Sequence, residues 1–353
     1  MKKLKDINRP IIISGPCSAE TEEQVMETAL RLKKTGKIDI LRAGIWKPRT
    51  RPNSFEGIGE IGLKWLIQAG KETNLPVITE VANSKHVELA LKAGFDRLWI
   101  GARTTVNPFA VQEIADALKG SGVEILVKNP INPDLNLWIG AIERLQNIGL
   151  TEVHAIHRGF SSIMSRKYRN DPMWEIPLEL KRIMPEIKMI CDPSHITGKR
   201  EMLFDVSQKA MDLIYDGLMI ESHIDPDNAW SDAAQQLTPE SLKDLLENLV
   251  LREENADNKK VIHDLQDLRA KINDIDDQLL QLISTRMEVA EQIGEYKKAN
   301  GITILQPNRW EEIKKLQIEI AEKTGLSEKF IMKYLEAIHQ ESIRHQTAVM
   351  NSK

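Results

Sequence analysis

The sequence predicts an α/β fold in which a (β/α)₈ TIM barrel is followed by a C-terminal all-α domain of three helices. Three observations support this prediction: eight short apolar runs lie within the first 225 residues, helix-like sequence separates them, and apolar spacing turns helical after residue 260. A chain of 353 residues has room for a barrel of about 250 residues and a smaller unit.

The eight apolar runs are the predicted barrel strands. They are rich in Ile, Val and Leu without strict alternation, which is typical of parallel strands covered on both faces. Their ranges are 11–17, 38–42, 76–80, 97–103, 124–128, 153–158, 188–192 and 217–221. Each run stops at a charged or metal-capable side chain. Since barrel active sites lie at the C-terminal strand ends, we expect the chemistry there.

The eighth barrel helix is expected at residues 238–251, with Thr238 as the cap and Pro239 at the first helical position. The polar residues 251–260 then predict a linker between a barrel of residues 1–250 and a helical domain of residues 261–353.

In the helical domain, apolar residues spaced alternately three and four apart predict a long helix from Val261 to about Asn300. Shorter helices are expected at 307–323 and after Ser327, a good N-cap. Three helices of this shape cover their long apolar seam poorly. We therefore expect a homodimer through this domain, or a larger assembly built on it.

The composition restricts the possible partners and location. A hydrophobic content of 41% is normal for a globular protein, and a net charge of -4 gives no reason to expect nucleic acid or a membrane as partner. With two cysteines and no apolar run near the length of a membrane span, a cytoplasmic location fits best.

Four residues after predicted strands one, seven and eight could together hold one divalent cation. They are Cys17, His195, Glu221 and Asp232. A thiolate, an imidazole and two carboxylates suit Mn²⁺ (the metal we expect first), Fe²⁺, Co²⁺ or Zn²⁺ rather than Mg²⁺ or Ca²⁺. Each residue alone has an ordinary structural explanation, but their joint placement favours a metal site.

A second group at the strand ends is cationic. It comprises Arg42, Lys47, Arg49, Arg103, Lys128 and Arg158. Converging cations need anionic ligands, and guanidinium groups match phosphate and carboxylate oxygens two at a time. We expect ligands with two phosphates, or with one phosphate and one carboxylate.

Five segments from different strands resemble the metal-dependent 3-deoxy-arabino-heptulosonate 7-phosphate (DAHP) synthase family. They are Gly15-Pro-Cys-Ser18, Lys47-Pro-Arg-Thr50, Gly101-Ala-Arg103, His157-Arg-Gly159 and Asp192-Pro-Ser-His195. The resemblance covers residues 10 to 240. It implies condensation of phosphoenolpyruvate with erythrose 4-phosphate and water, and a divalent metal on the four residues named above.

The same resemblance implies roles for the other strand-end residues. Lys47, Arg103, Lys128 and Arg158 would hold phosphoenolpyruvate, Arg42 and Glu80 would line the site, and Arg49 and Thr50 would bind the phosphate of erythrose 4-phosphate. Lys47, Glu80 and a water on the metal stay open as the group that activates the attacking water.

The sister enzyme, 3-deoxy-manno-octulosonate 8-phosphate synthase, uses arabinose 5-phosphate on the same barrel. Its sugar segment usually reads Lys-Ala-Asn-Arg-Ser where this chain has Lys47-Pro-Arg-Thr50, which favours the four-carbon sugar. One departure is that Arg51-Pro-Asn53 follows here, where the family often has Ser-Pro-Tyr.

The helical domain carries its own polar groups. Arg286 interrupts the apolar seam of the long helix, and Lys297, three turns on, shares its face. Arg269 points elsewhere, so in a dimer it could serve the partner's site. Ser342 and Gln346 share a face of the last helix. From the pattern alone, a coiled-coil dimerisation module whose cation fixes the register explains Arg286 equally well.

The segment Leu268-Arg-Ala-Lys-Ile272 and the later polar residues resemble the all-helical chorismate mutase class. The resemblance implies rearrangement of chorismate to prephenate. Arg269 of the partner chain, Arg286 and Arg309 would bind carboxylates, Lys297 the ether oxygen, and Ser342 and Gln346 would complete the pocket. Gln306 and Trp310 stand where that class often has an acidic pair, which puts the efficiency in question.

Together the two resemblances predict a bifunctional transferase and isomerase of the shikimate pathway, with prephenate inhibiting the barrel through the C-terminal domain. One alternative is a DAHP synthase whose helical domain only senses prephenate and has no catalytic activity. Another is a non-catalytic phosphosugar-binding scaffold.

Overall fold

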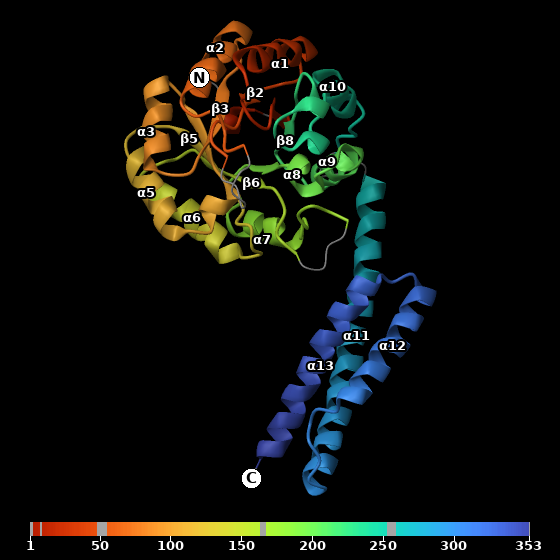
Figure 1. Ribbon diagram of the computed structural model, residues 1–353. Coiled ribbons are helices and arrows are strands. Elements are labelled where there is room, and N and C mark those ends of the chain that lie inside the picture. The colour runs from red at the N-terminus through yellow and green to blue at the C-terminus, as the bar shows by residue number, and fades with distance from the viewer. Residues whose placement is uncertain (1–2, 8, 48–54, 163–166, 253–258, 353) are drawn as a thin grey trace. The chain divides into compact units, whose positions relative to one another are not determined.

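The computed structural model describes residues 3–7, 9–47, 55–162, 167–252 and 259–352 (Figure 1). The chain forms two compact units, Met1–Glu254 and Asn255–Lys353. No helix in these ranges combines the length and the apolar character that a membrane crossing requires.

The first unit is the predicted barrel. Eight parallel strands close in sequence order, from β1 to β8, and β1 pairs with β8 from Ile11↔Gly217 to Gly15↔Glu221. The bounds are β1 Ile11–Gly15, β2 Ile40–Arg42, β3 Val77–Val81, β4 Arg97–Ile100, β5 Glu124–Lys128, β6 Val153–His157, β7 Met189–Cys191 and β8 Gly217–Glu221. The predicted fold class is therefore confirmed.

Helices follow the strands and cover the outside of the barrel (Figure 1). They are α1 Glu22–Thr35, α2 Ile61–Thr73, α3 Ser84–Ala93, α4 Ala102–Thr105, α5 Pro108–Leu118, α6 Leu135–Asn147, α7 Glu175–Ile183, α8 Pro193–Thr197, α9 Leu203–Asp212 and α10 Pro239–Glu247. Short 3₁₀ turns are η1 Leu4–Asp6, η2 Arg200–Met202, η3 Pro226–Asn228 and η4 Ala233–Gln235.

Thr238 caps α10 as expected, accepting a hydrogen bond from the Ser241 N–H. The helix ends at Glu247, before the predicted residue 251. The backbone of Val250 bonds instead to the Gln208 side chain, at 2.9 Å through both its N–H and its carbonyl. That tertiary contact replaces the last helical turn.

Strand residues alternate between two apolar layers. One layer fills the barrel and contains Ile11, Ile13 and Trp99, whereas Ile12 belongs to the layer between strands and helices. Leu4 of η1 joins the inner layer at 1% exposure. The N-terminal segment therefore closes the barrel at the end opposite the C-terminal strand ends.

Position 15, the last of β1, must be a glycine because β2 passes close to it. Its φ is +149°, and a Cβ there would lie 2.0 Å from the carbonyl oxygen of Arg42.

We expect Gly15→Ala to lower the free energy of unfolding by about 4 kcal/mol, combining steric overlap with backbone strain. Urea denaturation checks this. Gly140→Ala, where no atom lies within 4 Å of the added Cβ, is the matched control and should change stability by less than about 1 kcal/mol.

The second unit has the three predicted helices, α11 Lys259–Ala299, α12 Pro307–Thr324 and α13 Glu328–Asn351. Ser327 caps α13 by accepting the Phe330 N–H. A small core joins α12 to α13 through Ala321, Ile331 and Leu335. Within this unit the apolar seam of α11 remains open, since Leu268, Ile272 and Leu282 are 55%, 57% and 67% exposed.

Candidate functional site

The closure of the barrel brings the ends of β1, β2 and β8 together at one mouth. Glu221 ends β8 opposite Gly15, two residues before Cys17, and Arg42 ends β2. Arg42 Nη1 lies 3.3 Å from Glu221 Oε1, and Arg42 Nη2 donates to the Cys17 carbonyl at 3.2 Å. The predicted residues Cys17, Glu221 and Arg42 therefore meet at this mouth.

The Cys17 side chain contacts an acid and a cation. Its Sγ lies 3.3 Å from Asp232 Oδ2 and 2.9 Å from Lys47 Nζ, and Lys47 also donates to the Cys17 carbonyl at 2.8 Å. The pKa of the Cys17 thiol is raised to about 12, mainly by burial and then by the charge of Glu221, while Lys47 opposes this effect. The thiol is thus fixed at the mouth by polar contacts on two sides.

His195 is oriented by Asp192, the N-cap of α8. Asp192 Oδ2 lies 2.8 Å from His195 Nδ1 and accepts from Lys128 Nζ at 2.8 Å. Burial opposes the charge of Asp192, but His195 and Lys128 hold the pKa of its carboxyl well below its usual range. His195 Nε2 is left facing Glu221 Oε1 at 3.8 Å. At metal sites a carboxylate commonly accepts a hydrogen bond from the imidazole nitrogen that does not bind the metal, and so orients the ring.

The four predicted ligands fit a divalent metal by their chemistry. Sulfur, nitrogen and two carboxylate oxygens suit a transition metal, and the buried Glu221 Oε1 has no hydrogen-bond partner. The ligand atoms approach in pairs, Cys17 with Asp232 and His195 with Glu221. In the described part of the chain, the one trio of such atoms within 4.8 Å of one another lies elsewhere, in Glu124, Glu152 and His154.

Two of the predicted cations, Arg42 and Lys128, lie over the Trp99 ring, 4.8 and 5.6 Å from its centre. Trp99 Nε1 donates to Glu80 Oε2 at 2.9 Å, which fixes the predicted Glu80. One tryptophan, which the sequence did not single out, therefore contacts three of the predicted residues.

Arg158 and Arg103 complete the cationic side of the mouth. Arg158 is 8% exposed, and its backbone N–H donates to Asn129 Oδ1 at 2.7 Å. The pKa of Arg158 is lowered to about 10, mainly by burial; the charge of Asp192 opposes this effect, and the charges of Arg169 and Arg103 add to it. Arg103 is exposed on α4. The predicted sugar-phosphate residues Arg49 and Thr50 lie outside the described residues.

Sequence reasoning missed three polar residues that support the ligands. Arg169 Nη1 donates to Asp232 Oδ1 at 2.9 Å and to Gln235 Oε1 at 2.7 Å, and Gln235 Nε2 donates to Glu221 Oε2 at 2.7 Å. Gln236 Oε1 accepts the Cys17 N–H at 2.9 Å. Nothing marks Arg169 in the sequence, whereas Gln235 and Gln236 follow Asp232 closely enough to be suspected.

The helical unit has a pocket of about 440 Å³. Its lining includes six predicted or discussed residues: Arg286, Lys297, Arg309, Ser342, Gln346 and Gln306. Arg286 Nη1 donates to Ser342 Oγ at 2.5 Å, and Lys297 Nζ donates to Gln346 Oε1 at 3.2 Å and to the Ile304 carbonyl at 2.6 Å. No Asp or Glu is among the described residues that line it.

The other predicted residues of this unit are more peripheral. Arg309 lines the pocket but is exposed, and its Nη1 donates to Glu312 Oε2 at 2.8 Å. Arg269 is exposed on α11 and is not part of the lining. Trp310 stacks on His339 with ring centres 4.2 Å apart, and burial, with Arg286 and Lys297, lowers the pKa of His339. The two stacked rings line the pocket together with Arg286 and Lys297.

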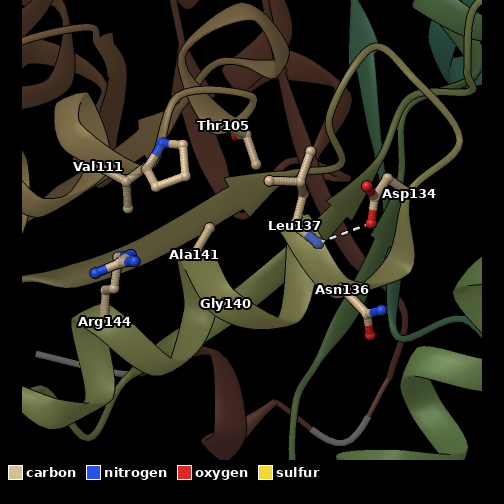
Figure 2. A pocket seen from close by; sticks show the side chains of 9 residues that line it. Thr105, Val111, Asp134, Asn136, Leu137, Gly140, Ala141 and Arg144 are labelled. Atoms are coloured by element: carbon tan, nitrogen blue, oxygen red, sulfur yellow. Dashed lines mark hydrogen bonds between the residues drawn. The ribbon is translucent and has the colours of Figure 1, made fainter.

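A further groove of about 270 Å³ lies along α5 and α6 (Figure 2). Asp134 caps α6 there by accepting the Leu137 N–H at 3.0 Å, and Arg144 donates to Gln112 at 3.0 Å. None of the predicted site residues lines it. We interpret it as a packing groove of the barrel's outer layer.

Each of the two parts of the chain matches a known family. Residues 5–256 match the DAHP synthetase I family, and residues 268–347 match chorismate mutase type II. The chain is 30% identical over 238 residues to the phospho-2-dehydro-3-deoxyheptonate aldolase of Thermotoga maritima, covering 67% of this chain and 68% of that protein. It is also 30% identical over 268 residues to a 2-dehydro-3-deoxyphosphooctonate aldolase of Paracidovorax citrulli, covering 69% and 90%.

A crystal structure of the Thermotoga maritima DAHP synthase superposes with a TM-score of 0.61 at 28% identity, covering 69% of this chain and 70% of that one.

Proposed function

We propose, because this chain belongs to the DAHP synthetase I family, that its barrel condenses phosphoenolpyruvate with erythrose 4-phosphate and water to give DAHP and phosphate. The observation that supports this best is the meeting of Cys17, His195, Glu221 and Asp232 with a ring of cations at one mouth. The DAHP synthase and chorismate mutase domains together support two enzyme activities.

A divalent metal held by Cys17, His195, Glu221 and Asp232, Mn²⁺ first among the candidates and Fe²⁺, Co²⁺ or Zn²⁺ next, would polarise the sugar aldehyde as a Lewis acid. The cations of the mouth would bind the carboxylate and phosphate of phosphoenolpyruvate and set its C3 toward the aldehyde carbon. Bond formation there leaves positive charge at C2, where water adds before phosphate leaves. Glu80, which accepts a hydrogen bond from Trp99, Lys47 and a water on the metal all stay open as the group that takes the proton of that water.

The test of this reaction is the loss of phosphoenolpyruvate absorbance in the purified full chain. We expect consumption only when erythrose 4-phosphate and Mn²⁺ are both present. Because relatives include 2-dehydro-3-deoxyphosphooctonate aldolases, arabinose 5-phosphate is the control sugar and should give none. If phosphoenolpyruvate is consumed with arabinose 5-phosphate but not with erythrose 4-phosphate, the substrate is the five-carbon sugar. If it is consumed with neither sugar, the proposal is contradicted.

The helical unit we assign to the rearrangement of chorismate to prephenate. A pocket with Arg286 and Lys297 on one side, and without a carboxylate among its described lining residues, suits a dianion. Arg286 and Arg309 would bind the carboxylates, Lys297 the ether oxygen, and Ser342 and Gln346 the remaining polar atoms. Arg269, exposed on α11, would reach the partner's pocket in a homodimer formed along the open α11 seam.

Both free cysteines are buried, which is compatible with a reducing cytoplasm.

Prephenate, bound in this same pocket, would inhibit the barrel. We expect Lys297→Ala to raise the prephenate concentration for half-inhibition of the condensation by about 10- to 100-fold, since it removes a charged donor. Lys298→Ala is the matched control, because Lys298 Nζ donates outside the pocket, to the Val349 carbonyl at 3.2 Å. If prephenate inhibits both variants equally, the helical pocket does not mediate the inhibition of the barrel.

The alternative, a helical domain that regulates without catalysing, makes a different prediction for the full chain. Prephenate would then bind and inhibit, but chorismate would not be converted. A domain that only binds prephenate could use the same pocket, including the Lys297–Gln346 contact at 3.2 Å and the stacked Trp310 and His339 rings. Chorismate turnover measured by its absorbance decides between the two.

A further inference from the structure

The end of the barrel opposite the mouth holds a second group of metal-capable side chains. Glu124 is the first residue of β5, His154 the second residue of β6, and Glu152 lies just before β6. Leu126 and Ile156 fill the barrel interior, so Glu124 and His154, two residues earlier on each strand, point the same way. His154 Nε2 lies 3.4 Å from Glu124 Oε1 and 4.0 Å from Glu152 Oε2.

The three side chains are buried but incompletely hydrogen-bonded. They are 1%, 3% and 4% exposed for Glu124, Glu152 and His154. Each acid uses one oxygen for a cation: Arg97 Nε donates to Glu124 Oε2 at 2.7 Å, and Lys3 Nζ to Glu152 Oε1 at 3.0 Å. Glu152 Oε2 and both ring nitrogens of His154 have no hydrogen-bond partner. An unsatisfied buried polar group costs about 1–3 kcal/mol, so this arrangement requires an explanation.

We propose that His154 Nε2, Glu124 Oε1 and Glu152 Oε2 bind a divalent transition-metal ion, with Zn²⁺ the best match, at the closed end of the barrel. Imidazole nitrogen and carboxylate oxygen are both Zn²⁺ ligands, and a water would complete a tetrahedral set of four. Ligand atoms about 2.1 Å from a tetrahedral ion are about 3.4 Å apart. The observed spacings of 3.4 and 4.0 Å need only a small contraction.

The local charge and access are compatible with a cation. Asp96 contacts Arg97 at 3.2 Å, and Asp6 accepts the Lys3 N–H at 3.1 Å. Lys5 Nζ also contacts Glu152 Oε1. The three cations Lys3, Lys5 and Arg97 are therefore set against four carboxylates, those of Glu124, Glu152, Asp96 and Asp6.

A cavity of about 310 Å³, lined by Lys3 and Glu152, lies beside the site and offers an entry path. The role of such an ion would be structural. Glu124 Oε1 also accepts the Leu4 N–H at 2.8 Å, so the ion would tie the N-terminal segment to the starts of β5 and β6, far from the mouth.

The test counts Zn²⁺ per full-length chain by isothermal titration and by elemental analysis after gel filtration. Two ions are expected for the natural sequence, one for His154→Gln, one for Cys17→Ala, and none for the double variant. One ion in the natural sequence that survives His154→Gln and is lost in Cys17→Ala would overturn this proposal and leave the mouth site intact.

Thermal unfolding adds a second readout. In the Cys17→Ala background Zn²⁺ should raise the melting temperature by several degrees, and His154→Gln should remove that rise. Glu152→Gln, which keeps the volume and removes one ligand charge, should weaken Zn²⁺ binding at least 10-fold. A rise that persists in both variants would exclude His154 and Glu152 as ligands.

Discussion

Cys17→Ala should lower the condensation rate at least 100-fold while chorismate turnover stays within about two-fold of the natural chain. The thiol is the proposed metal ligand that Asp232 and Lys47 both contact, at 3.3 and 2.9 Å. Alanine leaves the site three ligands and removes the soft donor that favours a transition metal. The loss of Lewis-acid stabilisation corresponds to about 3 kcal/mol or more of the barrier. Phosphoenolpyruvate consumption and chorismate loss are measured on the same preparation.

The matched control is Cys191→Ala. Cys191 is equally buried, but it belongs to the apolar layer between strands and helices. Its removal should cost stability and leave Mn²⁺ binding unchanged. If Cys17→Ala and Cys191→Ala reduce the condensation equally, Cys17 acts through packing and the proposed ligand set is wrong.

The strands were predictable because parallel barrel strands are buried on both faces and therefore appear as continuous apolar runs. Their ends were less predictable. The run 97–103 stops as a strand at Ile100, since the Gly101 carbonyl accepts the N–H groups of Thr104 and Thr105 and begins α4. A hydrogen bond of that kind leaves no mark in the apolar pattern.

Residues that end strands could be placed at the mouth from the sequence, because the topology alone brings strand ends together. Residues that act from loops could not. Arg169 meets Asp232 across 63 positions of the chain, and no periodicity connects them. His154 and Glu124 were missed for another reason: they begin strands, where a charged residue usually faces solvent, and only the three-dimensional structure shows them buried.

In the helical unit the pattern left two explanations for Arg286, a register-fixing cation or a ligand-binding one. The structure shows it on the same pocket as Lys297, bonded to Ser342 of α13. Trp310 and Gln306 depart from the acidic pair that the resemblance to the mutase class leads us to expect. In the structure Trp310 stacks on His339 and Gln306 lines the pocket, so an aromatic ring and an amide stand at these positions.

Arg286→Ala is expected to lower chorismate turnover by about 100- to 1,000-fold, or about 3–4 kcal/mol of transition-state stabilisation. The guanidinium projects into a pocket with no carboxylate among its described lining residues to compete for it, so its charge is available to a substrate carboxylate. Steady-state kinetics of the full chain measure the effect. Arg286→Lys, which keeps the charge but loses the planar fork, should recover only part of it.

Arg344→Ala separates this role from a general effect of charge on the helices. Arg344 lies on α13 within the same unit, but it is exposed and its Nε donates to Glu341 at 3.1 Å. Its removal should leave turnover within about two-fold, as expected for an exposed pair. If Arg286→Ala binds prephenate normally, keeps a folded helical domain and converts chorismate at the natural rate, Arg286 fixes the helix register and the pocket does not use it in catalysis.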